Sequence, residues 1–215
     1  MKLQKFGGYA AIASLCAYIV GVLYIIFIQP NGFSDDPAKA MAAISASPGE
    51  FYMIYLLFMV GNIIGLVTVV ALHERMHADA KYLSHMMLIA MSASTVIQVT
   101  EEIIRIVSIG MIVMPQDLSA YRPFYFIAES LHFAGGHTAA WGWLFFGCAI
   151  LATRSFSRVL GWLSLVTGIL WIPLFFLIQI GITFTIPIIY LTNFSVSIWV
   201  GITLIRQKQP MQAAE

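Results

Sequence analysis

Apolar runs of about twenty residues recur along the whole chain, and this pattern restricts the fold more than any other feature. A helix of about twenty apolar residues is what crosses the hydrocarbon core of a bilayer. Of the 215 residues, 60% are hydrophobic and 10% are charged, whereas soluble domains have roughly 45–50% and 25%. A soluble fold would leave much of this apolar surface uncovered. The sequence therefore predicts an all-α, polytopic transmembrane helix bundle.

About six spans account for the apolar runs, and the short connections between them predict a single transmembrane domain over residues 1–215. No small-x-small cleavage site follows the first run, so it is predicted to be an uncleaved helix. The largest connection is an external segment, 29–50, in which an aspartate before Pro37 predicts a short interfacial helix. That helix would be a lid over the bundle or a gate to a ligand site. The predicted spans are 6–28, 51–72, 86–114, 124–151, 159–180 and 184–205.

Most basic residues fall on one side of the membrane if these spans alternate in direction. Lys and Arg are retained on the cytoplasmic side. The opposite side has Lys39 and Arg122, and Arg105 lies within a span. The sequence therefore predicts a multi-pass protein of the inner (plasma) membrane with both termini in the cytoplasm. The residues on the cytoplasmic side are Lys2, Lys5, Arg75, Lys81, Arg154, Arg158, Arg206 and Lys208.

The net charge is +1, and no run of Lys and Arg offers a track for phosphates, which argues against a nucleic-acid-binding protein. The two cysteines, Cys16 and Cys148, fall at different depths in the predicted spans. Side chains at different depths cannot meet the short distances of a disulfide. The partners predicted are the bilayer itself, a small-molecule or cation ligand, and other membrane subunits.

Charged residues interrupt the third and fourth predicted spans. In the third span Glu101 and Arg105 are one helical turn apart on a polar face. In the fourth span Glu129 and His132 are also one turn apart. Because the third span runs outward and the fourth inward, both pairs fall in the outer half of the membrane and can meet. The predicted buried polar cluster comprises Gln98, Glu101, Glu102, Arg105, Glu129, His132 and His137.

The charges of this cluster do not cancel. A charge inside a bilayer costs at least ~2.5 kcal/mol unless it pairs or lines a wet cavity. Arg105 can neutralise one carboxylate, most simply that of Glu101. Glu102 and Glu129 then need protons, a bound cation or a protonated histidine to balance them. We therefore expect a protein that binds a small molecule or ion at the cluster, or that serves as a subunit of a membrane complex.

Three interpretations of the cluster remain open from the residues alone. The first is a structural polar network with a protonated glutamate, and the second is a proton- or cation-coupled binding cavity. The third is a divalent-metal site in a membrane-embedded metal-dependent enzyme. Glu-x-x-His on one helix is a di-metal ligand spacing, but a di-iron bundle needs two such motifs and the chain has one. The predicted metal ligands are Glu102, Glu129, His132 and His137.

A second motif lies at the cytoplasmic end of the second span. His73-Glu74-Arg75-Met76-His77 matches the zincin pattern, in which two histidines one turn apart hold zinc and the glutamate is the base. The acidic pair at positions 101 and 102 would lie about 36 Å further along a continuous helix. Asp79 or His85 could supply a third ligand. A solvated loop is the simpler interpretation.

Two segments are similar to motifs of the intramembrane CAAX-type proteases, namely Glu101-Glu102-Ile103-Ile104-Arg105 and Phe133-Ala134-Gly135-Gly136-His137. That family has three residues between the glutamate pair and the arginine, and a further histidine motif downstream. Here the gap is two residues, no histidine follows His137, and Asn193 alone cannot replace one. The likeness is therefore partial and implies at most a degenerate protease-like protein.

A broader likeness rests on residues 158–164 (RVLGWLS), 168–171 (GILW) and 198–202 (IWVGI). These segments resemble the closing half of a bacterial family of six-helix integral membrane proteins of unknown function. The chain departs from that family at Asn193, where an acidic residue is common, and in placing Glu102 before Arg105. The resemblance implies the same six-helix layout and implies no activity.

Overall fold

The computed structural model describes residues 2–29, 32, 34–153, 155–174 and 185–206, and every regular element in these ranges is a helix. This agrees with the predicted all-α class. The last part of the predicted span 159–180 lies outside the described residues. The elements are α1 (Lys2–Phe27), α2 (Pro37–Ala46), α3 (Pro48–Met76), α4 (Lys81–Ser108), the π-helix η2 (Ile109–Val113), α5 (Leu118–Thr153), α6 (Arg158–Trp171) and α8 (Thr185–Arg206).

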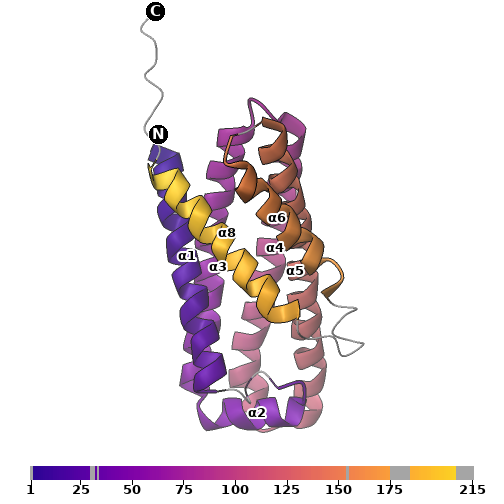
Figure 1. The fold of residues 1–215 in the computed structure, drawn as a ribbon. Helices are drawn as coiled ribbons and strands as arrows, with labels where there is room; N and C mark the ends of the chain where they lie inside the picture. Colours follow the sequence, from indigo (N-terminus) through magenta and orange to yellow (C-terminus); the bar gives the residue numbers. More distant parts are fainter. Residues whose placement is uncertain (1, 30–31, 33, 154, 175–184, 207–215) are drawn as a thin grey trace, which may run out of the picture.

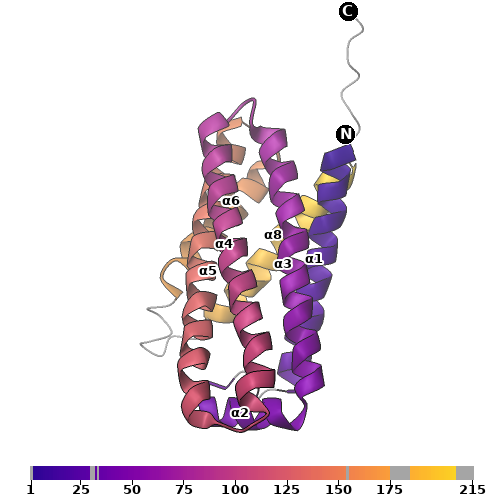
Figure 2. The same cartoon turned by 180° about the vertical axis from the view of Figure 1, so that it is seen from behind.

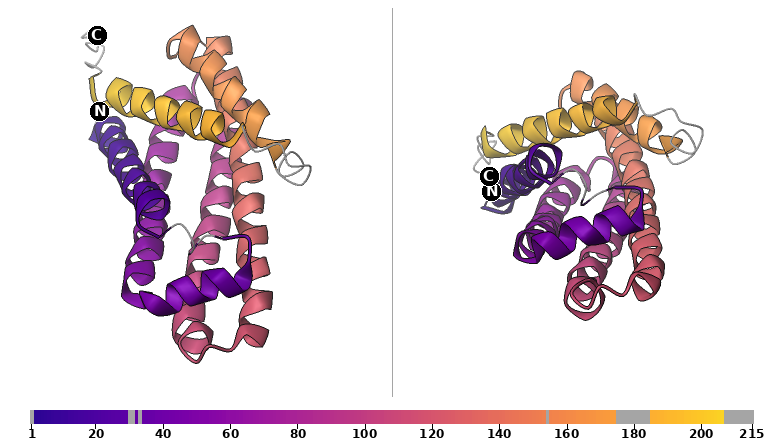
Figure 3. Two further views of the ribbon diagram at one scale, coloured as in Figure 1. Left: turned by 60° about the horizontal axis from the view of Figure 1, so that its bottom comes forward. Right: turned by 90° about the horizontal axis from the view of Figure 1, so that it is seen from below.

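The long helices form a ring that closes on itself. Going around it, α1 packs against α3, α3 against α4, α4 against α5, α5 against α6, α6 against α8, and α8 against α1. Helices α1, α3, α4 and α5 run side by side along the length of the molecule, and α8 crosses them obliquely (Figure 1). Figure 2 shows α1, α3, α4 and α5 from behind. Short helix α2 lies across one end, as Figure 3 shows from below.

Three of the described helices are long and apolar enough to cross a membrane. They are Leu3–Phe27, Pro48–Met76 and Ile188–Arg206, with mean hydropathies of 2.4, 2.3 and 1.8. Helices α4 and α5 are longer than about 30 Å at 1.5 Å per residue, but they carry polar and charged residues. Helix α6 is apolar but has only 14 described residues. The described part of the protein is therefore helical, with three helices that could cross a membrane.

The outer surface of the ring is strongly apolar. Phe27 is 76% exposed, and Phe6 and Trp162 are each 62% exposed. Soluble proteins rarely expose large contiguous apolar patches, so such a surface indicates contact with lipid. In lipid, apolar burial does not drive helices together, and close packing through small residues takes its place.

Glycines mark the places where neighbouring helices approach most closely. A Cβ atom on Gly7 would lie 2.3 Å from the Ala71 Cβ, where α1 meets α3. One on Gly8 would lie 2.8 Å from the Gly201 carbonyl oxygen, where α8 closes the ring against α1. Any side chain at these two positions would push the helices apart.

The interior has two apolar cores, one at each end of the molecule. The first, which includes Leu72, Met87 and Phe146, joins α3, α4, α5, α6 and α8. The second joins α2, α3, η2 and α5 and includes Phe51 and Ile109. The buried polar residues of α4 from Ser94 to Ser108 lie between these cores along the helix, so this polar interior has apolar side chains at both ends.

Polar caps set the ends of two helices at the α2 end of the molecule. The Asp36 carboxylate accepts a hydrogen bond from the Ala38 backbone N–H at 2.9 Å, as expected for an aspartate before Pro37. Asp117 accepts from the backbone N–H groups of Ser119 and Ala120 at the start of α5. A hydrogen bond from the Ser119 hydroxyl and, after it, these two backbone bonds lower the pKa of Asp117. The caps fix where α2 and α5 begin.

Candidate functional site

A chain of hydrogen bonds crosses the interior from α1 to α5. The Tyr18 hydroxyl on α1 is hydrogen-bonded to the Asn62 side chain on α3 and lies 3.0 Å from Gln98 Oε1 on α4. Gln98 Nε2 donates to Ser94 Oγ at 3.0 Å, and the Ser94 hydroxyl donates to the Gly135 carbonyl oxygen at 2.8 Å. We call these five residues the polar belt.

Gly135 is what lets α5 come close enough to α4 to join the polar belt. A Cβ atom at this position would lie 2.7 Å from Gln98 Cγ. Sequence reasoning placed Gln98 in the cluster but did not identify its partners Tyr18 and Asn62. A tyrosine or asparagine inside an apolar run was the available signal, but nothing in the sequence shows that the two residues face each other.

Arg105 binds two carboxylates from two helices. Its Nε donates to Glu101 Oε1 at 2.9 Å, and one terminal nitrogen donates to Glu129 Oε1 at 2.7 Å. The Glu101–Arg105 ion pair predicted from the sequence is thus present. The Arg105–Glu129 ion pair was not predicted, because the sequence reasoning left Glu129 unpaired. Arg105 and Glu101 are almost fully buried, whereas the Glu129 side chain is 32% exposed.

The two histidines expected at the cluster are placed differently. His132 Nδ1 lies 3.3 Å from Glu101 Oε2, and its side chain is 45% exposed. His137 is exposed, and its Nε2 accepts a hydrogen bond from Trp141 Nε1 at 3.4 Å. His132 therefore belongs to the ion-pair group, and none of the contacts found for His137 reaches that group.

Of the three carboxylates in the cluster, Glu102 is the one that forms no ion pair among the described residues. It is 6% exposed, and its Oε2 is buried with no hydrogen-bond partner among the described residues. It lies within electrostatic range of Glu101, Arg105 and His132. Three carboxylates (−3) and one arginine (+1) give the group a formal charge of −2 when His132 is neutral. A buried carboxylate without a partner is a candidate site for a positive charge.

A small cavity lies beside Arg105, on the side of the cluster that faces α2. Its volume is about 10 Å³, which is the space of about one water molecule. This volume is too small for an organic ligand. The lining residues are Ile44, Tyr55, Arg105, Ser108, Tyr121, Phe124, Tyr125 and Ala128.

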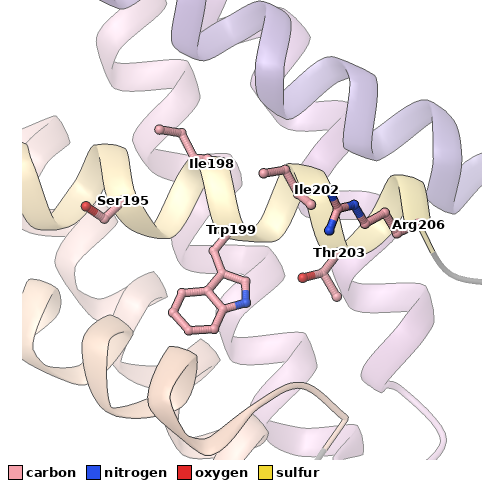
Figure 4. A pocket seen from close by; sticks show the side chains of 6 residues that line it. All are labelled: Ser195, Ile198, Trp199, Ile202, Thr203 and Arg206. Carbon is pink, nitrogen blue, oxygen red and sulfur yellow. The ribbon is translucent and has the colours of Figure 1, made fainter.

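The larger hollow, of about 650 Å³, belongs to a different part of the molecule. All of its lining residues are on α8, as Figure 4 shows, so it is an open groove along one helix and not an enclosed chamber. It shares no residue with the cluster. The lining residues are Ser195, Ile198, Trp199, Ile202, Thr203 and Arg206.

The metal ligands predicted at the cluster do not converge on one point. Glu129 is bound to Arg105, and His137 contacts Trp141. Among the described residues, the group of side chains close enough to share a metal ion is instead His73, His77 and His85, at the α3–α4 junction. The cluster has the chemistry of an acid–base and ion-pair group.

No protein-family model, no curated protein and no solved structure matches this chain.

Proposed function

We propose that the protein spans the membrane six times and has both termini in the cytoplasm. The α1 start, the α3–α4 junction, the α5–α6 junction and the α8 end share one end of the molecule, opposite α2 (Figure 1). The described basic residues divide between these ends as the positive-inside rule expects. The end opposite α2 has Lys5, Arg75, Lys81, Arg158 and Arg206, and the α2 end has Lys39 and Arg122.

Labelling of single cysteines tests this orientation. In a background without Cys16 and Cys148, Asp35→Cys and Tyr82→Cys introduce thiols at exposed positions on the two sides. We expect a membrane-impermeant maleimide applied to intact spheroplasts to label Asp35→Cys, and to label Tyr82→Cys only after permeabilisation. The opposite pattern would reverse the orientation, and labelling of both from one side would contradict the six-span layout.

We further propose that the protein binds a proton or a small monovalent cation at Glu102. The observation that carries this proposal is the buried Glu102 Oε2 without a hydrogen-bond partner among the described residues. Arg105 cannot neutralise Glu102 as well, because its nitrogens already donate hydrogen bonds to Glu101 and Glu129. An unpaired carboxylate away from water is costly, and a proton or a bound cation removes that cost.

The small size of the cavity beside Arg105 favours an ion over a larger ligand in this part of the interior, and Glu102 itself does not line that cavity. The cavity beside Arg105 has room for about one water molecule. It lies on the α2 side of the cluster, and its lining includes the hydroxyl-bearing residues Tyr55, Ser108 and Tyr121. The apolar core of Leu72, Met87 and Phe146 lies toward the other side.

Thermal unfolding of the purified protein in lipid nanodiscs tests the proposal. The midpoint is followed between pH 5 and 9 in sodium, lithium or choline chloride at constant ionic strength. A ligand that binds only the folded state raises the midpoint. We expect the wild-type midpoint in choline chloride to fall as the pH rises, and lithium or sodium to restore it in part.

Glu102→Gln is the diagnostic variant, because it keeps the shape of the side chain and removes the charge. We expect its midpoint to be insensitive to these cations and to exceed the wild-type midpoint at pH 9 by about 5 °C or more. For a chain of this size each 1 kcal/mol moves the midpoint by about 2–4 °C. Asp35→Asn, an exposed acid at the same end, should behave like the wild type. A Glu102→Gln variant with wild-type pH and cation responses would refute the proposal.

A further inference from the structure

Three histidines meet where α3 and α4 join, at the end of the molecule opposite α2. His73 lies in the last turn of α3, His77 directly follows that helix, and His85 lies in the second turn of α4. The ring centroids are 5.0 Å apart for His73 and His77, and 4.8 Å apart for each of these rings and His85. The three rings thus form a compact triangle, which we call the histidine triad.

Local structure brings the three rings together. His73 and His77 are four residues apart and share one helix face. The chain then reverses tightly, with the Ala80 N–H donating to the Met76 carbonyl oxygen at 2.8 Å and the Ser84 N–H donating to the Ala80 carbonyl oxygen at 2.9 Å. Met76 on α3 and Met87 on α4 are fully buried and belong to the same apolar core. His85 therefore faces the pair from α3.

Each histidine of the triad has a nitrogen available for a ligand. His85 Nδ1 lies 2.7 Å from the Lys81 carbonyl oxygen. A carbonyl can only accept, so Nδ1 must carry the proton, and Nε2 keeps its lone pair. A backbone partner on the other ring nitrogen is typical of metal-bound histidines. Nδ1 of His73 and Nδ1 of His77 are buried and have no hydrogen-bond partner among the described residues.

We propose that His73, His77 and His85 form a binding site for a divalent first-row transition metal, with zinc as the representative ion. Imidazole nitrogens suit zinc, copper, nickel and iron. The ligand atoms lie within 4.8 Å of one another. Zinc–nitrogen bonds of about 2.0–2.1 Å place tetrahedral ligands about 3.3 Å apart. Ring rotations that move each ligand nitrogen by about 1 Å would bring the three nitrogens to this spacing around the ion.

The charged neighbours of the triad leave room for a cation. The Arg75 guanidinium has partners outside the triad: one terminal nitrogen donates to the Ser155 carbonyl oxygen at 2.6 Å, and the group lies 4.2 Å above the Phe156 ring. Glu74, Asp79 and Lys81 are exposed. Three imidazoles leave the fourth tetrahedral position open to water, which is the arrangement of catalytic and exchangeable zinc sites. The ion would also tie α3 to α4 at this end.

Calorimetric titration with zinc chloride tests the site. The protein is purified without a polyhistidine tag, stripped with a chelator and kept in lipid nanodiscs. We expect one zinc ion per chain. His77→Ala and His85→Ala should each weaken the affinity at least about 100-fold, since even the loss of outer partners of metal ligands costs about 10–100-fold. His137→Ala, at an exposed histidine outside both the triad and the ion-pair group, should leave the affinity unchanged.

The visible absorption of bound Co²⁺ reports the geometry of the metal site, and a variant that merely loses stability would not change it in the same way. Bound Co²⁺ in a site with three imidazoles should give visible absorption bands that disappear in His73→Ala, while circular dichroism shows that the variant keeps its helices. Absence of stoichiometric zinc binding, or binding unchanged in all three triad variants, would overturn the proposal. The Glu102→Gln variant should bind zinc normally, so failure of this site and failure of the proposed cation site at Glu102 are distinguishable.

Discussion

Arg105 determines how charge is shared in the interior. A guanidinium presents several donors in a rigid plane, so one arginine can bind a carboxylate on its own helix and another on a neighbouring helix. Arg105 does this with Glu101 and Glu129. Its pairing therefore links α4 to α5, and Glu102 is left as the carboxylate of the group that forms no ion pair among the described residues.

Removal of the arginine charge should be strongly destabilising. We expect Arg105→Gln to lower the free energy of unfolding by about 3–5 kcal/mol, because a partner of buried charges is lost and the carboxylates remain. Arg105→Lys should lose less, since an ammonium keeps the charge but cannot bind both carboxylates in the same geometry. Denaturant unfolding in detergent micelles measures both. Arg122→Gln, an exposed arginine at the same end, is the control and should change stability by less than about 0.5 kcal/mol.

The residues of the site were predictable to the extent that local spacing determines them. Glu101 and Arg105 are four residues apart, so a helix alone brings them into contact. The partner of Glu129 was not predictable, because contact between two helices depends on how each is rotated about its axis. The same reason explains His137. It is one and a half turns beyond His132, and that rotation leaves it exposed beside Trp141.

At the scale of the helix, the length of an apolar run and the length of the helix that contains it differ. The apolar run predicted a span over 51–72, whereas α3 extends over Pro48–Met76. Backbone hydrogen bonding continues past the apolar residues as long as nothing breaks it. This extension is what carries His73 and His77 onto a helix end, where the sequence alone favoured a solvated loop. For this helix, hydropathy predicted the apolar run correctly and its ends poorly.

The cap of α5 should make stability depend on pH. Hydrogen bonds from Ser119 and Ala120 lower the pKa of Asp117. A group with a lowered pKa in the folded state stabilises it above the unfolded pKa of about 3.9, and this contribution is lost as the pH falls through the folded pKa. We expect the wild-type midpoint to fall more than that of Asp117→Asn between pH 5 and 3. Equal slopes in thermal unfolding of the two proteins would contradict this role.

At the scale of the whole molecule, the apolar outer surface is the feature that follows most directly from the sequence. The ring arrangement does not follow in the same way, because hydropathy says nothing about which helices are neighbours. Glycine contacts such as Gly8 against Gly201 determine the pairing of α1 with α8. Such contacts depend on where two helices cross, and a single sequence does not contain that information.

Contact with lipid can be tested by fluorescence quenching. Trp162 is 62% exposed on α6, whereas Trp143 on α5 is only partly exposed and packs against the apolar core. We expect phospholipids with brominated acyl chains to quench a single-tryptophan variant that retains Trp162 more strongly than one that retains Trp143, since bromine quenches at short range. Stronger quenching of the variant that retains Trp143 would mean that Trp143 and not Trp162 faces lipid, and would contradict this prediction.

Closure of the ring by α8 has a consequence for how the protein is made. Among the described helices, α1 is synthesised before all the others and its partner α8 after them. Until α8 arrives, α1 has one neighbour in place of two, and the wall of the interior between α1 and α6 stays open to lipid. The ion-pair group on α4 and α5 would then lie in an interior that α8 has not yet closed. Closure of this interior is therefore a late step in assembly, and a chain that stops before α8 should be a substrate for membrane quality control.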